Sequence, residues 1–261
     1  RERKKERERE RKTPIILYMN RELQIALAEI QTISPELRGL DLSAVREFTE
    51  AISADFGIEQ IEVAAGLYQA LSNQVGNTAE TLRFLNDAAE FSVATVTSLS
   101  NSVDLLSGAL NALDLNASQT RRIMDTLFTT IELGRITGEE LANAFGKILP
   151  IANRLGVSLE EVAAAVSEMS IQGVKFDKTA ILLTRVMTGL LKPTKALKAT
   201  FDDLGISSVR AGVQANGLVG FLKLLLDQTD GTIEGTSEFF NELRELQGVL
   251  LLTADGGDRV A

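Results

Sequence analysis

Apolar residues recur at helical spacing along almost the whole chain, in stretches of about ten to twenty residues that Gly, Asn, Ser or Pro residues separate. One stretch shows the pattern clearly, with apolar residues three or four positions apart at Leu141, Phe145, Ile148, Ala152 and Leu155. This spacing places them on one face of a helix and predicts that the face is buried. Pro150 stands inside the same stretch and is expected to kink it.

The pattern predicts an all-α fold, a multi-helix array of short antiparallel helices with a charged helix at the N-terminus. No strand pattern competes with it. Helices are expected at 15–33, 43–55, 59–75, 78–98, 101–114, 118–133, 138–155, 159–172, 177–191, 194–204, 217–228 and 235–253. The stretch 207–216 fits least well, because Val209 and Val213 favour a short extended loop before a helix that begins at Gly217.

Two helix starts carry full sequence signatures. Thr137 and Ser158 each stand three positions before a glutamate, Glu140 and Glu161, which is the spacing of a capping box. Apolar pairs flank both boxes at the positions of a hydrophobic staple: Ile136 with Leu141, and Val157 with Val162. The two segments echo each other, but two echoes do not define a repeat of fixed period.

Glycines mark several expected helix ends. Gly134, Gly156, Gly173 and Gly205 each follow an apolar periodic stretch. A residue in the left-handed conformation closes a helix there, and glycine adopts this conformation without a side-chain clash. The sequence therefore predicts left-handed helix ends at all four positions.

Composition limits the classes of function. The chain has 261 residues, of which 44% are apolar, enough to bury a sizeable core in one or two domains. It contains no Cys and no His, which removes thiolate chemistry, disulfides and the usual general base. Its carboxylates show no paired motif. We predict no enzyme activity, no cofactor, and no catalytic, cofactor-binding or metal-ligating residue; Leu141, Phe145, Ile148 and Leu155 are candidates for fold integrity only.

Charge is distributed unevenly along the chain. Residues 1–12 carry a net charge of +4, whereas the whole chain carries −9, so the remainder carries −13. A basic arm can bind nucleic acid, because Lys and Arg neutralise phosphates. The interleaved glutamates and the lack of aromatic residues in this segment favour instead a solvated charged helix.

No apolar stretch approaches the roughly 20 residues that cross a bilayer. The longest are 218–226, which Gly220 and Lys223 interrupt, and 249–252. The chain begins at Arg1, and we expect it to be a piece of a longer protein.

The order of these features resembles a known family. Residues 134–206 hold two capped helices, a third helix that ends at a Gly, and a Leu-Lys-Pro break. Before them stand the helix pair of 54–76 and the helix, loop and helix of 100–137, and after them an aromatic, Arg, Gly and aliphatic stretch from Phe239. This order resembles the core region of phage tail tape measure proteins over roughly residues 50–257. The doubled aromatic residue at Phe239 and Phe240 departs from the family pattern.

The resemblance implies a structural virion protein of a tailed phage. Such a protein lies in the lumen or at the end of the tail, sets the length of the tail tube, scaffolds assembly in the host cytoplasm, and leaves ahead of the DNA. It implies as partners the tail tube protein, tail tip or baseplate proteins, tail assembly chaperones and other copies of itself. It implies no sequence-specific nucleic acid, and a transient host membrane contact only through the parent chain.

Two alternatives remain open from the sequence: a membrane-active helical segment that aids genome entry, and an unrelated soluble helical adaptor. The domain organisation that we predict is a charged helical arm over 1–40, a tape measure core over 41–257, and the tail of a fragment over 258–261. Gly and Pro punctuation further predicts that the core folds as a helical domain, while the rod that scales with tail length lies in flanking sequence.

Overall fold

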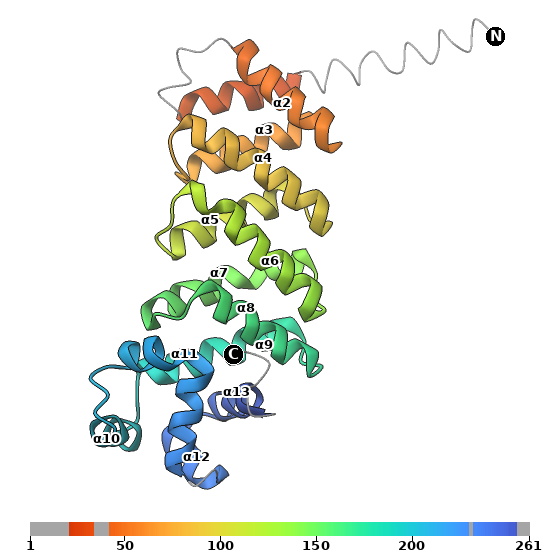
Figure 1. The fold of residues 1–261 in the computed structure, drawn as a ribbon. Helices are drawn as coiled ribbons and strands as arrows, with labels where there is room; N and C mark the ends of the chain where they lie inside the picture. The colour runs from red at the N-terminus through yellow and green to blue at the C-terminus, as the bar shows by residue number, and fades with distance from the viewer. Residues whose placement is uncertain (1–20, 34–41, 230–231, 255–261) are drawn as a thin grey trace, which may run out of the picture. The chain divides into compact units, whose positions relative to one another are not determined.

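The computed structural model describes residues 21–33, 42–229 and 232–254. These residues form helices with short connections and contain no strand, which confirms the all-α prediction for this part of the chain (Figure 1). Residues 21–33 are helical, in agreement with the end of the expected helix. Most of the charged arm and the predicted domain boundaries at residues 40 and 257 lie outside the described residues and stay predictions.

The chain divides into two compact units, residues 1–107 with 116–120, and residues 108–115 with 121–261. The first unit contains the following helices: α2 (Leu42–Phe56), α3 (Gln60–Ser72), α4 (Thr78–Thr95), most of α5 (Leu99–Ala112) and the 3₁₀ turn η2 (Ala117–Gln119). Helices α2, α3 and α4 pack against one another. Phe84 and Leu85 of α4 are buried together with Leu67 of α3, so this unit has its own core.

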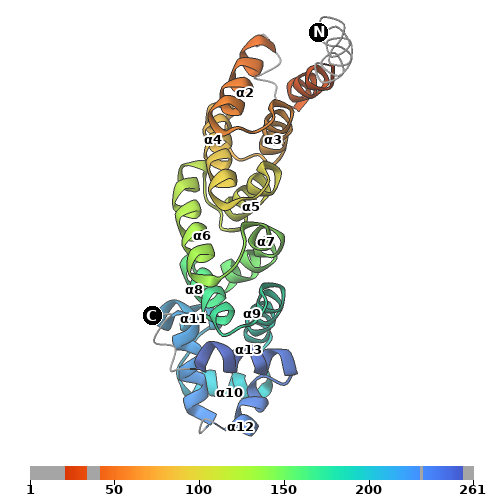
Figure 2. The ribbon, with the colours of Figure 1, turned by 90° about the vertical axis from the view of Figure 1, so that its right-hand side faces the viewer.

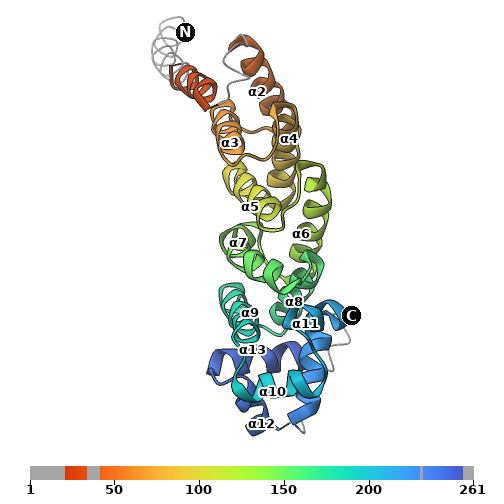
Figure 3. The same ribbon diagram turned by 90° about the vertical axis from the view of Figure 1, so that its left-hand side faces the viewer.

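The second unit contains the remaining elements: α6 (Thr120–Gly134), α7 (Gly138–Leu155), α8 (Leu159–Ile171), α9 (Phe176–Leu191), α10 (Lys195–Asp203), α11 (Val209–Leu226), η3 (Asp227–Thr229), α12 (Ile233–Phe239) and α13 (Leu243–Thr253). Helix α9 is central, because α7, α8 and α13 all pack on it. Helices α7 and α9 lie on one side of this unit, and α6 and α8 lie on the opposite side (Figures 2 and 3).

The apolar stripe of α7 is buried as predicted, with all of its residues inaccessible to solvent: Leu141, Phe145, Ile148, Ala152 and Leu155. The helix runs through Pro150. Proline removes the hydrogen bond to the carbonyl four residues earlier, which belongs to Gly146. Both residues are exposed, so water can bond the free carbonyl.

Both predicted capping boxes are present. The Thr137 Oγ1 atom accepts from the Glu140 backbone N–H at 3.2 Å, and the Glu140 carboxylate accepts from the Thr137 N–H at 2.9 Å. Ser158 and Glu161 repeat the arrangement at 3.2 and 2.9 Å. The staple residues beside both boxes are buried. These starts are local, so the sequence alone specifies them.

Three of the four predicted glycine helix ends are confirmed, with φ of 80° at Gly156, 84° at Gly173 and 67° at Gly205. The prediction for Gly134 is wrong, because the next residue, Arg135, takes the positive φ of 54°. Side-chain ends lie close to Gly134. A Cβ atom there would lie 2.8 Å from the Cδ1 atom of Ile136 and 3.2 Å from the Oγ atom of Ser167.

A three-residue connector recurs between the helices from α4 to α9. Its first residue has positive φ, and the next helix or helical turn begins after its third, at 96–98, 114–116, 135–137, 156–158 and 173–175. At four of the five, the second residue donates its N–H to the carbonyl five positions earlier, as Val157 does to Ala152. This is the closing bond of a Schellman motif. The capping boxes at Thr137 and Ser158 each stand at the end of one of these connectors, so the similarity of the two segments is part of a longer series.

The extended loop expected at 207–216 is wrong. Helix α11 begins at Val209, and the Ser208 hydroxyl caps it by accepting from the Ala211 N–H at 3.1 Å. The helix expected from Gly217 is present, because Gly217 has non-helical φ 69° and ψ 168° and the second half of α11 begins directly after it. The break lets the two halves fold against each other, and the Phe221 ring contacts Gly212 so closely that no side chain fits there.

The single helix expected over 235–253 is also wrong, because the chain leaves helical geometry at Phe240 (φ −122°, ψ 87°) before α13 begins. Phe239 and Phe240 are both buried. The break between α12 and α13 buries both.

Candidate docking grooves

Within the ranges that the structure describes, no group of His, Cys, Asp or Glu side chains is arranged to hold a metal ion. No described helix is long and apolar enough to cross a membrane. The surface features that stand out are two grooves of the second unit, one between α6 and α8 and one between α7 and α9.

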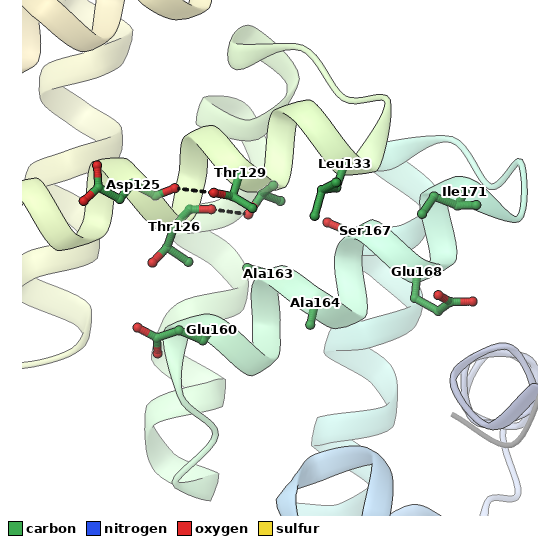
Figure 4. Close-up of a pocket in the computed structure, with 11 residues that line it drawn as sticks. Asp125, Thr126, Thr129, Leu133, Glu160, Ala163, Ala164, Ser167, Glu168 and Ile171 are labelled. Atoms are coloured by element: carbon green, nitrogen blue, oxygen red, sulfur yellow. Dashed lines mark hydrogen bonds between the residues drawn. The ribbon is translucent and has the colours of Figure 1, made fainter. Parts of the chain in front are cut away.

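The α6/α8 groove has a volume of about 470 Å³ (Figure 4). Its lining consists of small, hydroxyl, apolar and acidic side chains from the two helices: Asp125, Thr126, Thr129, Thr130, Leu133, Glu160, Ala163, Ala164, Ser167, Glu168 and Ile171. Helix α8 lines the groove with the small side chains of two alanines and a serine, which leave space between the two helices. A groove of this shape fits a partner helix.

The threonines of α6 do not require polar partners. Thr126, Thr129 and Thr130 donate their hydroxyl hydrogens to carbonyls four residues earlier in their own helix, at 3.0, 2.9 and 2.7 Å. Leu133 and Ile171 stand at one end of the groove, and their exposed fractions are 59% and 42% (Figure 4). Exposed aliphatic side chains of this size are typical of contact surfaces when they line a groove.

The lining of the α6/α8 groove is acidic. Asp125, Glu160 and Glu168 give it three negative charges, and Arg122, just outside the lining, offsets one of them through a 2.8 Å ion pair with Glu160. Glu168 is buried and accepts from the Gln172 amide at 3.2 Å. The groove therefore favours a partner surface with positive charge.

The α7/α9 groove has a volume of about 600 Å³ and the opposite charge. Its lining is formed by Asn143, Ala144, Lys147, Asp177, Ala180, Ile181, Thr184, Arg185, Thr188 and Arg244. Three basic residues face one acidic residue, Asp177, in this lining. Ile181 is 46% exposed and supplies an apolar contact. Arg185 also lies 3.5 Å from Glu242, a weak pair because both side chains are about half exposed.

Helix α13 brings Arg244 to the α7/α9 groove by packing tightly on α9. A Cβ atom at Gly248 would lie 2.5 Å from the Cγ2 atom of Val186, so only glycine fits this contact. Glu245 of α13 is buried against Gly189 of α9. Burial raises the pKa of Glu245 above its ordinary value, and a hydrogen bond from the backbone N–H of Glu242 opposes this shift.

The residues predicted from the sequence to matter for fold integrity lie in the core, and none of them lines a groove. Leu141, Phe145, Ile148 and Leu155 are all inaccessible to solvent. Neither groove was predicted from the sequence. The available signal was the run of exposed or half-exposed threonines at 126 and 129 on a helix whose opposite side is apolar, but such residues are also common on solvated faces.

Comparisons with known proteins identify relatives. A model of the family described as phage-related minor tail protein matches residues 44–243. A tape measure protein of Pneumococcus phage Dp-1 is 25% identical over 200 residues, which cover 73% of this chain and 16% of that protein. A probable tape measure protein of Clostridium phage phiCD119 is 22% identical over 218 residues, which cover 77% and 23%. The chain thus spans less than a quarter of each relative, and no solved structure matches it.

Proposed function

Because this chain belongs to the phage-related minor tail protein family, which makes it a structural component of a phage tail, we propose that it is a folded segment of a tape measure protein. The observation that carries the proposal is the family match over 44–243, together with two relatives that bear the name tape measure protein. The parent protein sets the length of the tail tube, scaffolds tail assembly, and leaves the virion ahead of the DNA.

The role of this segment within the parent protein is that of a folded anchor. Both units bury aromatic and aliphatic residues, such as Phe84 in the first and Phe145 in the second. If the helices were stretched out in series, these side chains would be exposed to water. The free-energy cost of exposure is about 1.5–3 kcal/mol for each large apolar residue. The part that scales with tail length therefore lies in the sequence that flanks this segment.

The two grooves supply the surfaces for assembly. Their helical lining and exposed aliphatic residues support contacts with helices of other tail components, among them the tube protein, the tip or baseplate proteins, the assembly chaperones and other copies of the chain. The net charge of −9 opposes wrapping of DNA around the segment. Membrane contact during infection belongs to other parts of the parent chain.

The location and the release of the segment are tested by quantitative mass spectrometry of purified virions. Peptides from residues 42–254 are expected in intact particles, in fixed ratio to the tail tube protein, and are expected to disappear from particles that have ejected their DNA. Their absence from intact virions contradicts the proposal that the segment is part of the tail. Their persistence in emptied particles contradicts its release.

A further inference from the structure

The two grooves of the second unit have opposite charge and lie on opposite sides of it. The α6/α8 groove carries Asp125, Glu160 and Glu168, whereas the α7/α9 groove carries Lys147, Arg185 and Arg244 against Asp177. Helices α6 and α8 are on one side of the unit, and α7 and α9 are on the other (Figures 2 and 3). Each groove therefore faces away from the groove that complements it in the same copy.

We propose that the acidic α6/α8 groove of one copy docks onto the basic α7/α9 groove of a second copy of this chain. The pairing places the acidic lining, in which Asp125 and Glu160 are exposed and Glu160 is paired with Arg122, opposite a lining with a net charge of +2. It also joins the exposed side chains of Leu133 and Ile171 with that of Ile181. Complementary charge steers such an encounter, and the aliphatic contacts stabilise it.

Symmetric pairing of either groove with itself is disfavoured. Two α6/α8 grooves face to face bring two acidic linings together, and two α7/α9 grooves bring two basic linings together. Like charges across an interface are costly. The contact is therefore heterologous, and each docked copy leaves one groove free for a further copy, which produces a ring or a filament.

This inference rests on the proposed function and adds to it how copies of the chain associate. Copies that join head to tail assemble without any other tail component. The association depends on ionic strength, because most of the groove charges are exposed and salt screens them. The readout is hydrodynamic mass, which is independent of tail length and of release from the virion.

The test is sedimentation velocity on the chain of residues 1–261 and on two variants. The α6/α8 variant is Asp125→Lys with Leu133→Asn, and the α7/α9 variant is Lys147→Glu with Ile181→Asn. Wild type is expected to associate at about 100 µM in low salt, and each variant alone to raise the dissociation constant at least about tenfold. An equal mixture of the variants is expected to form a 1:1 pair, because each retains the groove that the other lacks.

Matched controls reverse a charge outside the two linings: Glu132→Lys on α6, the helix of Asp125, and Lys178→Glu on α9, the helix of Ile181, both at exposed positions. They are expected to associate like wild type. Circular dichroism establishes that every variant keeps its helix content. A wild type that stays monomeric overturns the proposal, and so does a groove variant that associates as wild type does, a mixture that fails to pair, or a control that behaves like a groove variant.

Discussion

The Glu161 carboxylate accepts a hydrogen bond from the Leu218 backbone N–H at 2.9 Å, while its other oxygen accepts from the Ser158 N–H at 2.9 Å. One side chain thus closes the N-terminus of α8 and the N-terminus of the second half of α11. A Cβ atom at Gly217 would lie 3.0 Å from Oε1 of Glu161, the oxygen that accepts from Leu218, and the φ of Gly217 is 69°. Glu161 and the break at Gly217 therefore form one structural element.

This double role distinguishes Glu161 from Glu140, which closes the box of α7 in the same way but bonds no second helix within the part of the chain that the structure describes. Glu161→Ala is expected to lower the free energy of unfolding by about 2–3 kcal/mol, because the backbone N–H groups of Ser158 and Leu218 both lose their acceptor. Glu140→Ala is expected to cost about 1 kcal/mol. Urea unfolding followed by circular dichroism measures both, and equal losses contradict the double role.

Val96 has a φ of 54° and an exposed fraction of 91%, so a β-branched residue occupies a left-handed position with almost no packing. Val96→Gly is expected to stabilise the chain by about 1 kcal/mol, because glycine adopts this conformation without strain. Val93→Gly, at an exposed position inside the same helix, is expected to destabilise it by a similar amount. Thermal unfolding of the two variants gives the signs, and a destabilised Val96→Gly refutes the strain.

The Glu245 carboxylate is expected to weaken the fold at neutral pH, because burial raises its pKa above the ordinary value of 4.5. The penalty is complete above the raised pKa and disappears as the pH falls below the ordinary value. Glu245→Gln is therefore expected to be more stable than wild type near pH 7, with a difference that shrinks on acidification. Urea unfolding across this pH range measures it, with the exposed Glu238→Gln as control; a difference that does not change with pH contradicts the argument.

The contact between α9 and α13 leaves no room at Gly248, where a Cβ atom would lie 2.5 Å from Val186 and 3.1 Å from the Leu182 carbonyl oxygen. Gly248→Ala is expected to cost about 1–3 kcal/mol, since the two helices must separate. Gly108→Ala, at a helical position with open space around it, is expected to stabilise α5 by up to about 1 kcal/mol. Calorimetry compares them, and a neutral Gly248→Ala shows that α13 is not held tightly on α9.

The sequence predicted features that depend on a few neighbouring residues. The boxes at Thr137 and Ser158, the stripe of α7 and three glycine helix ends follow from spacing alone, and the structure confirms them. It failed at two other places. The helix end expected at Gly134 falls one residue later, at Arg135, and the chain leaves helical geometry at Phe240, where two adjacent rings are buried.

The recurring connector was hidden for a related reason. Its left-handed position holds Val96, Asp114 and Arg135 as well as glycines, so no single residue type marks it. The grooves were hidden because they combine residues of helices that are not adjacent in the chain, such as Asp125 with Glu160, and Lys147 with Asp177. The opposite charges on the two sides of the second unit can be predicted only when the fold is known.

We propose that this chain is the folded anchor of a tape measure protein whose length-scaling rod lies in the flanking sequence. Tail length in negative-stain electron micrographs checks this in phage that carry in-frame deletions of equal size in the flanks or within residues 43–255. We expect tails shortened by about 1.5 Å per residue removed from a helical flank, and failed tail assembly when the folded segment is cut. Tails of unchanged length from every deletion, or tails that shorten equally wherever residues are removed, contradict it.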